Sequence, residues 1–177
     1  HIIETKLIVP PVRPDTVART ELVERLRASP APVVSINAPA GYGKSTLLAQ
    51  WAASDARPFA WISLDERDND PVVLLSHLVG ALDRVKPVGT KVLKALRGPE
   101  VSLWSTIVPP IGAWLSTLER PLVIALDDAH ELHIQDCIDA MIALSQHLPE
   151  GSQLALAGLE LGGVALLDRA ANGLDLA

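Results

Sequence analysis

A glycine-containing stretch near residue 40 carries the residue types that bind phosphate. Residues 38–46 are APAGYGKST, and Gly43, Lys44 and Ser45 match the end of the pattern Gly-x-x-x-x-Gly-Lys-Ser/Thr. Backbone N–H groups in such a loop point inward at an anion, and the N-terminus of the following helix adds a favourable dipole. We therefore predict that this phosphate loop (Walker A) binds the phosphates of ATP or ADP.

Individual positions of the phosphate loop have expected roles. Lys44 should neutralise the β- and γ-phosphate oxygens, and the Ser45 hydroxyl should bind Mg²⁺. Gly41 and Gly43 give the backbone freedom to wrap the phosphates, whereas Ala38, at the first glycine position of the pattern, requires a negative φ. The remaining nucleotide contacts expected in the loop are Pro39, Ala40, Tyr42 and Thr46. The alternative is a glycine-rich turn before an ordinary helix.

Two adjacent carboxylates follow a later apolar run. Asp127 and Asp128 come directly after residues 122–126, LVIAL, which are typical of a buried strand. Ligands of open parallel sheets lie at the carboxyl ends of the strands. We therefore predict that Asp127 holds Mg²⁺ through water (Walker B) and that Asp128 orients or polarises the attacking water. Lys44 and Asp128 are then the candidate catalytic residues. The alternative is that one aspartate caps the next helix.

Two other groups of polar residues could bind a metal, but their patterns favour structural roles. His130 and His133 have a spacing that suits a metal, but no third ligand is visible, so we expect exposed histidines or histidines at a helix start. Asp65, Asp68 and Asp70 lack the glycine and the terminal glutamate of a calcium-binding EF-hand. A turn followed by a helix cap is the better interpretation of these aspartates.

Strands and helices alternate around these motifs. Apolar runs predict strands at residues 33–37, 59–64, 122–126 and 154–157. Helices are predicted at residues 20–28, 44–54, 71–85, 90–96, 101–119 with a break at prolines 109 and 110, and 134–148. Residues 1–19 are expected to be irregular, because they contain several prolines. The alternation is typical of a parallel sheet, so we predict a three-layer α/β/α P-loop NTPase fold.

Composition and charge narrow the function classes. The 177 residues carry a net charge of −6, so the chain makes a poor nucleic-acid clamp, and DNA contact would need another domain. The single cysteine, Cys137, allows no internal disulfide and suits a reducing cytoplasm. No apolar run reaches the roughly 18 residues of a membrane span, and no signal peptide pattern is present. We therefore expect a cytoplasmic protein without a membrane partner.

Several segments together resemble one family. They are residues 5–10 with 17–19, the phosphate loop with 47–51, residues 61–65 with 68–71, and residues 126–130. The combination resembles the nucleotide-binding domain of MalT-like, large ATP-binding transcriptional regulators of the LuxR type, which belong to the signal-transducing STAND class of P-loop ATPases. The resemblance covers residues 5 to about 160 and is far more specific than the phosphate loop alone.

The resemblance implies a function and partners. Val17 and Arg19 match the segment that contacts the adenine base in this class. Family members use ATP or ADP as a slow switch: ADP keeps the protein closed and monomeric, whereas ATP with a small-molecule or protein inducer permits self-association. Their DNA binding resides in a C-terminal helix-turn-helix that follows further helical repeats. Residues 1–177 would be only the N-terminal part.

The resemblance also implies a layout for the chain. Residues 1–177 form one ATP-binding domain, with an adenine-contacting segment and helix at 1–30, a core at 31–160 and a poorly defined end of the core at 161–177. The expected strand order is 2-3-4-1. A fifth strand is expected beyond residue 177, which would truncate the fold at its C-terminal end.

One departure from the family bears on hydrolysis. Leu159 stands where the family usually has an arginine that senses the nucleotide, with Arg169 as a partial substitute. The leading hypothesis is therefore an ATP/ADP-binding switch with weak, slow Mg²⁺-dependent ATPase activity at most. Two alternatives stay open: a P-loop enzyme with true turnover, such as a kinase or ATPase, and a nucleotide-free interaction module on a P-loop scaffold.

Overall fold

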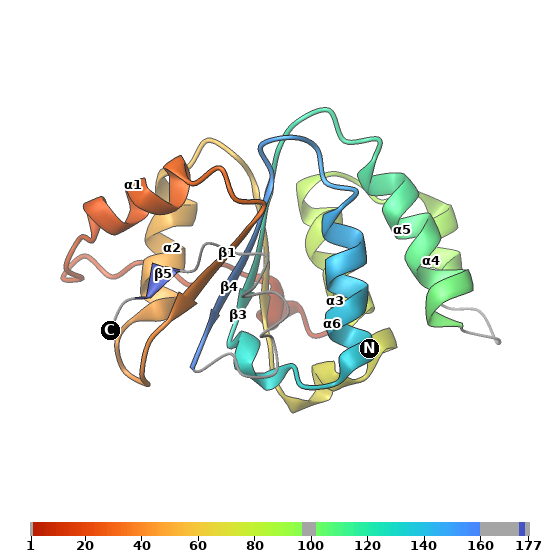
Figure 1. The fold of residues 1–177 in the computed structure, drawn as a ribbon, viewed down its shortest axis with the longest axis horizontal. Coiled ribbons are helices and arrows are strands. Elements are labelled where there is room, and N and C mark those ends of the chain that lie inside the picture. Colours follow the sequence, from red (N-terminus) through yellow and green to blue (C-terminus); the bar gives the residue numbers. More distant parts are fainter. Residues whose placement is uncertain (1, 97–101, 160–173, 176–177) are drawn as a thin grey trace.

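A parallel sheet forms the centre of the molecule (Figure 1). The computed structural model describes residues 2–96, 102–159 and 174–175. In this part of the chain the sheet has five strands in the order β2-β3-β4-β1-β5, and every neighbouring pair is parallel. The strands are β1 (Val33–Asn37), β2 (Phe59–Ser63), β3 (Val123–Asp127), β4 (Gln153–Gly158) and β5 (Leu174–Asp175). The predicted α/β fold with a parallel sheet is confirmed, as is the order 2-3-4-1 of the first four strands.

The fifth strand differs from the prediction. The family resemblance places it beyond residue 177, whereas the structure pairs Ile36 with Leu174 and Asn37 with Asp175. A strand of two residues is too short for a hydrophobic period to reveal it. The remainder of the predicted end of the core, Arg169 included, lies outside the described residues.

Helices cover both faces of the sheet (Figure 1). One face carries α1 (Thr20–Ala28) and α2 (Lys44–Ser54), and the other carries α3 (Pro71–Val85), α4 (Thr90–Ala95), α5 (Val108–Leu115) and α6 (Gln135–Ser145). Side chains alternate between the two faces along β1, β2, β3 and β4. In β3, for example, Val123 and Ala125 pack on the α1 and α2 side, while Ile124 and Leu126 pack on the opposite side. Two apolar cores result, one in each helical layer.

The residues at the N-termini of α3 and α5 explain why these helices begin there. The Asp70 side chain accepts hydrogen bonds from the N–H groups of Val72 and Val73, so the predicted turn and helix cap before α3 are confirmed. The predicted break at the two prolines is wrong. A π-helical turn (η3, Leu103–Ile107) precedes α5, and both prolines lie in the first turn of α5, where a missing N–H costs little.

The N-terminal segment is tied to the edge strand β2. Residues Glu4–Leu7 form a short 3-10 helix (η1), so the prediction that all of residues 1–19 are irregular is wrong here. The prolines that led to this prediction come after η1. The helix η1 contacts β2 and α3. Asp68 is fully buried, and its carboxylate pairs with Lys6 and with Nδ1 of His77. The Ile3 N–H donates to Nε2 of the same histidine. This network holds the N-terminal segment beside β2, the edge strand of the sheet.

Candidate functional site

The loop between β1 and α2 has the conformation that the phosphate-binding pattern requires. Gly41 and Gly43 have φ values of 83° and 73°, which glycine adopts readily. Ala38 is not among the residues with positive φ, so it has the negative φ that its place in the pattern demands. Helix α2 begins at Lys44, directly after the left-handed Gly43. The loop therefore leads directly into the N-terminus of a helix, as the sequence predicted.

Two polar side chains at the start of α2 lie in defined positions. Lys44 is buried, and its ammonium donates hydrogen bonds to the carbonyl oxygens of Ala38 and Pro39, at 2.8 and 3.0 Å. The Ser45 hydroxyl donates to Asp127 Oδ1 at 2.9 Å. The structure thus joins the phosphate loop to the end of β3, although β4 lies between β1 and β3 in the sheet.

Asp127 is the last residue of β3 and is only 4% exposed. Burial raises the pKa of its carboxyl group; the hydrogen bond from Ser45 opposes this shift, and the charge of Asp128 adds to it. The net effect is a raised pKa. A cation beside the carboxylate would relieve this cost. A serine hydroxyl and a carboxylate oxygen within hydrogen-bonding distance also form a donor set that suits Mg²⁺.

Asp128 has an unusual backbone conformation. Its φ is 56°, which makes it the one non-glycine residue with positive φ in the described part of the chain. It precedes the short 3-10 helix η4 (Ala129–Glu131), yet its side chain makes no capping hydrogen bond. The alternative role as a helix cap therefore has no support for Asp128. Its side chain is partly exposed beside the buried Asp127.

Two polar atoms at this edge of the sheet are buried without a hydrogen-bond partner in the described residues. They are Oδ1 of Asn37, at the end of β1, and Nδ1 of His130, in η4. Buried polar atoms in proteins nearly always have a hydrogen-bond partner. A polar ligand bound at the carboxyl ends of the strands would supply a partner for these two atoms. No sequence pattern singles out Asn37, and from the sequence His130 is weighed only as a metal ligand. Each residue stands at or just after the carboxyl end of a strand.

The segment at residues 17–19 lies beside the phosphate loop. Gln50 of α2 donates from Nε2 to the Val17 carbonyl at 2.8 Å, and its Oε1 accepts from the Arg19 N–H at 3.0 Å. A Cβ atom added to Gly43 would lie 3.3 Å from Nη2 of Arg19. The structure therefore brings the Arg19 side chain to the phosphate loop and holds the Val17 backbone against α2. Gln50 is a further candidate site residue; it lies in the segment 47–51 that carries the family resemblance, but no role for it follows from the sequence.

The other predicted loop residues have different exposures. Tyr42 is 54% exposed, Pro39 and Ala40 are also exposed, and Thr46 is partly buried in the first turn of α2. Leu159 is partly exposed directly after β4, so the apolar side chain stands at the strand end where the family arginine was expected.

A single asparagine ties together the loops that follow β2 and β3. Asn69 Nδ2 donates to the Glu131 carbonyl at 2.7 Å, and Asn69 Oδ1 accepts from the N–H groups of His133 and Ile134 at 2.9 and 3.2 Å. The Leu64 N–H also donates to the Asp127 carbonyl. These bonds fix the loop that follows Asp128.

Comparison with curated proteins finds relatives that share one name. The HTH-type transcriptional regulator MalT of Klebsiella pneumoniae is 32% identical over 157 residues, and that of Serratia proteamaculans is 35% identical over 158 residues. Each match covers 88% of this chain and 17% of the relative. The regulator of the same name from Cronobacter sakazakii is 33% identical over 155 residues. Over most of its length, this chain is therefore related to the MalT regulators. No protein-family model matches it.

This relationship agrees with the resemblance found in the sequence, and it covers a limited region of the relatives. The chain spans about a sixth of the length of these MalT relatives. Within the described residues, no helix of this MalT-like chain is long and apolar enough to cross a membrane.

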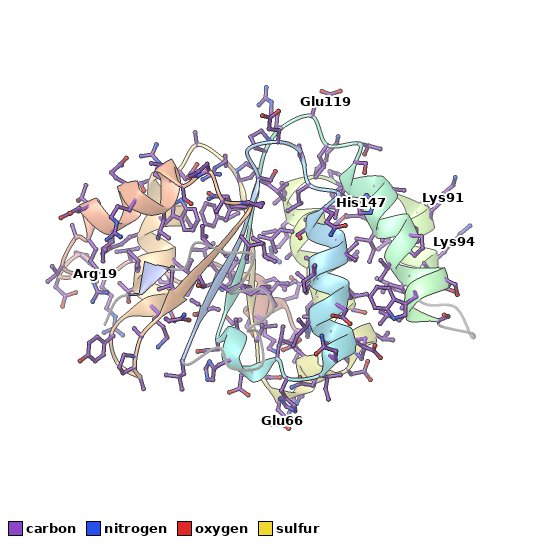
Figure 2. The ribbon with its side chains drawn as sticks, in the orientation of Figure 1. Arg19, Glu66, Lys91, Lys94, Glu119 and His147 are labelled. Atoms are coloured by element: carbon purple, nitrogen blue, oxygen red, sulfur yellow. The ribbon has the colours of Figure 1, made fainter. Side chains whose placement is uncertain are left out.

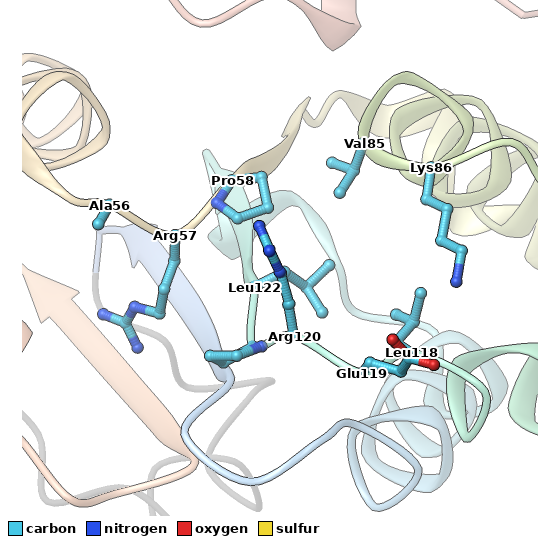
Figure 3. Close-up of a pocket in the computed structure, with 10 residues that line it drawn as sticks. Ala56, Arg57, Pro58, Val85, Lys86, Leu118, Glu119, Arg120 and Leu122 are labelled. Carbon is cyan, nitrogen blue, oxygen red and sulfur yellow. The ribbon is translucent and has the colours of Figure 1, made fainter.

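A cavity of about 570 Å³ lies at the opposite end of the molecule from the candidate site. It lies beside the residues that lead into β2 and β3, and Arg57, Lys86 and Arg120 are among its lining residues (Figure 3). Glu119, beside this cavity, and Glu66, in the loop after β2, lie at opposite ends of the structure (Figure 2). Ligands of parallel sheets bind at the carboxyl ends of the strands, so we do not assign the cavity to the site of this MalT-like chain.

Proposed function

We propose that this chain is the ATP/ADP-binding switch domain of a MalT-like transcriptional regulator, with slow Mg²⁺-dependent hydrolysis at most. The observation that carries the proposal is the hydrogen bond between Ser45 Oγ and Asp127 Oδ1. This bond brings the hydroxyl of the phosphate loop into contact with the carboxylate that ends β3. The two groups lie at the carboxyl ends of the strands, where nucleotides bind in this architecture.

The residues suggest how a nucleotide would bind. The phosphates would lie against the loop N–H groups at the N-terminus of α2. Lys44 would exchange its bonds to two loop carbonyls for bonds to the β- and γ-phosphates. Mg²⁺ would replace the hydrogen bond between Ser45 and Asp127, with the hydroxyl as a direct ligand and the carboxylate acting through water. Asp128 would face the attacking water.

A regulatory switch is favoured over an enzyme with fast turnover. Leu159 cannot supply a charge to the transferred phosphate at the end of β4, and an arginine that stabilises the transition-state charge is worth several orders of magnitude in rate in other P-loop NTPases. Self-association in the ATP state, an inducer and promoter binding through a helix-turn-helix belong to the same proposal, together with a cytoplasmic location. They follow from the family and would involve parts of such regulators beyond these residues.

The experiment that tests the switch compares hydrolysis with assembly. Steady-state phosphate release from Mg·ATP is measured beside sedimentation with ADP or with a non-hydrolysable ATP analogue. The proposal predicts turnover below about one per minute, compared with the roughly 1–100 s⁻¹ that is typical of kinases. Fast turnover that Asp128→Asn abolishes would support the P-loop enzyme instead. An Asp15→Asn variant serves as the matched control, because Asp15 is exposed and lies outside the site.

A further inference from the structure

The backbone of Arg19 is held in place by a side chain of α2. One amide, that of Gln50, accepts from the Arg19 N–H and donates to the carbonyl of Val17. The same helix begins at Lys44, so the amide fixes residues 17–19 to the helix that ends the phosphate loop. Arg19 lies on the α1 and α2 side of the sheet, away from Lys91 and Lys94 on the other side (Figure 2).

The guanidinium group of Arg19 packs against the phosphate loop. A Cβ atom on Gly43 would lie 3.3 Å from Nη2, 3.7 Å from Cζ and 3.8 Å from Nη1. The whole planar group therefore faces the residue that precedes Lys44. Within residues 2–96, 102–159 and 174–175, this guanidinium has no ion-pair or hydrogen-bond partner. The cation keeps its charge at all ordinary pH values, and its fork of N–H groups matches phosphate oxygens.

We propose that Arg19 binds the phosphate chain of the nucleotide and that Gln50 is the residue that positions it. This inference rests on the proposed function and changes one part of it. The family resemblance gives Arg19 a contact to the adenine base, whereas its guanidinium lies at the phosphate loop. Val17, which is 78% exposed, is left to contact the base. Arg19 then supplies a second cation beside Lys44 to a site in which Leu159 supplies none.

The test separates phosphate binding from base binding. The affinities of the wild-type chain for ADP, GDP and inorganic pyrophosphate are measured by competition with a fluorescent ADP analogue, with competitors up to millimolar concentrations. Arg19→Met should weaken all three ligands by about tenfold or more, because a hydrogen bond to a charged group contributes that much to binding. The ratio of ADP to GDP affinity should stay constant. Arg19→Lys, which keeps the charge but loses the fork, should give an intermediate loss.

Gln50→Leu tests the positioning role. It should reproduce the loss for pyrophosphate, and the double variant with Arg19→Met should be no weaker than Arg19→Met alone to within about twofold, because the two residues act as one unit. Arg25→Met and Gln135→Leu are matched controls on exposed positions of α1 and α6, and neither should change any affinity. Far-UV circular dichroism confirms that each variant is folded.

Each contrary outcome overturns a different statement. If Arg19→Met leaves pyrophosphate binding unchanged and removes the preference for ADP over GDP, Arg19 contacts the base, and the inference is wrong while the proposed function stands. If Gln50→Leu lowers only the melting temperature, its role is structural. If the folded wild-type chain binds none of the three ligands, the proposed function fails and the inference fails with it.

Discussion

The Ser45 hydroxyl donates a hydrogen bond to Oδ1 of Asp127 at 2.9 Å, across 82 positions of the chain. The bond connects the first turn of α2 to the end of β3. It also partly offsets the cost of burying the Asp127 carboxylate, although the pKa of this carboxyl group stays raised. The two side chains therefore depend on each other before any ligand arrives.

Ser45→Ala should remove the effect of Mg²⁺ on nucleotide affinity. Without the hydroxyl, the metal loses its direct protein ligand, and the buried Asp127 carboxylate loses a donor, which costs roughly 1–3 kcal/mol of stability. Calorimetric titration with ATP, with and without Mg²⁺, measures the first effect, and urea unfolding measures the second. Ser54→Ala is the control, because among the described residues that hydroxyl bonds only to carbonyls of its own helix. A variant that still binds Mg·ATP more tightly than ATP alone would contradict the assignment.

Asp127→Asn should stabilise the nucleotide-free protein at neutral pH while weakening Mg·ATP binding. A carboxyl whose folded pKa is raised destabilises the fold when it is ionised; its favourable contribution is present below the unfolded pKa and is lost as pH rises through the folded pKa. The stability gain of the variant should therefore be present at pH 7, shrink as pH falls through the raised folded pKa, and be absent below the unfolded pKa of about 4. Thermal unfolding at both pH values checks this. Equal melting temperatures of wild type and variant at pH 7 would show that the ionised Asp127 carboxylate does not destabilise the fold.

How far the sequence predicts the site depends on the range of each interaction. The start of α2 at Lys44 follows from local signals, since the glycines, the preceding apolar strand and the helix period are all adjacent. The meeting of Ser45 and Asp127 follows from the rule that ligands lie at one edge of a parallel sheet. The contacts of Gln50 and Asn69 do not follow from any pattern. Each side-chain amide bonds to backbone groups more than 30 positions away. Every residue type offers a backbone carbonyl, and nearly every type offers an N–H, so the amino-acid sequence does not identify such partners.

Asp68→Ala should destabilise the fold more than any exposed substitution nearby. The fully buried carboxylate pairs with Lys6 and His77 and also accepts from the Asp65 N–H. Removing one partner of a buried charge network typically costs about 3–5 kcal/mol. Urea unfolding measures the loss, with Glu66→Ala as the exposed control. A loss below about 1 kcal/mol would mean that the N-terminal segment is not held by this network.

Acid should remove a second source of stability, at the end of α2. Although burial alone would raise the pKa of Asp55, hydrogen bonds from Arg57 and Trp51 lower it to about 2, from an ordinary 3.8. A depressed folded pKa stabilises the fold above the unfolded pKa, and this contribution is lost as pH falls through the folded pKa. The shift corresponds to at most roughly 2 kcal/mol.

The Asp55→Asn variant isolates that contribution. Wild type should be more stable than the variant at pH 6, and the difference should narrow as pH falls from 3.8 to about 2. Thermal unfolding across this range measures the difference. A constant difference at every pH would show that the lost hydrogen bonds, rather than the ionisation of Asp55, account for the change.

The measurement that tests the central claim most directly is a calorimetric titration of the purified chain with ADP and with Mg·ATP, repeated on Lys44→Ala. Lys91→Ala, on the exposed side of α4, is the control. The proposal predicts binding in the micromolar range or tighter for wild type and control, and a loss of at least about tenfold in Lys44→Ala, since a charge-assisted bond to phosphate is removed. If the folded wild-type chain binds neither nucleotide, or if Lys44→Ala binds both as tightly as wild type, the phosphate loop does not bind nucleotide, and an interaction module on a P-loop scaffold becomes the better account.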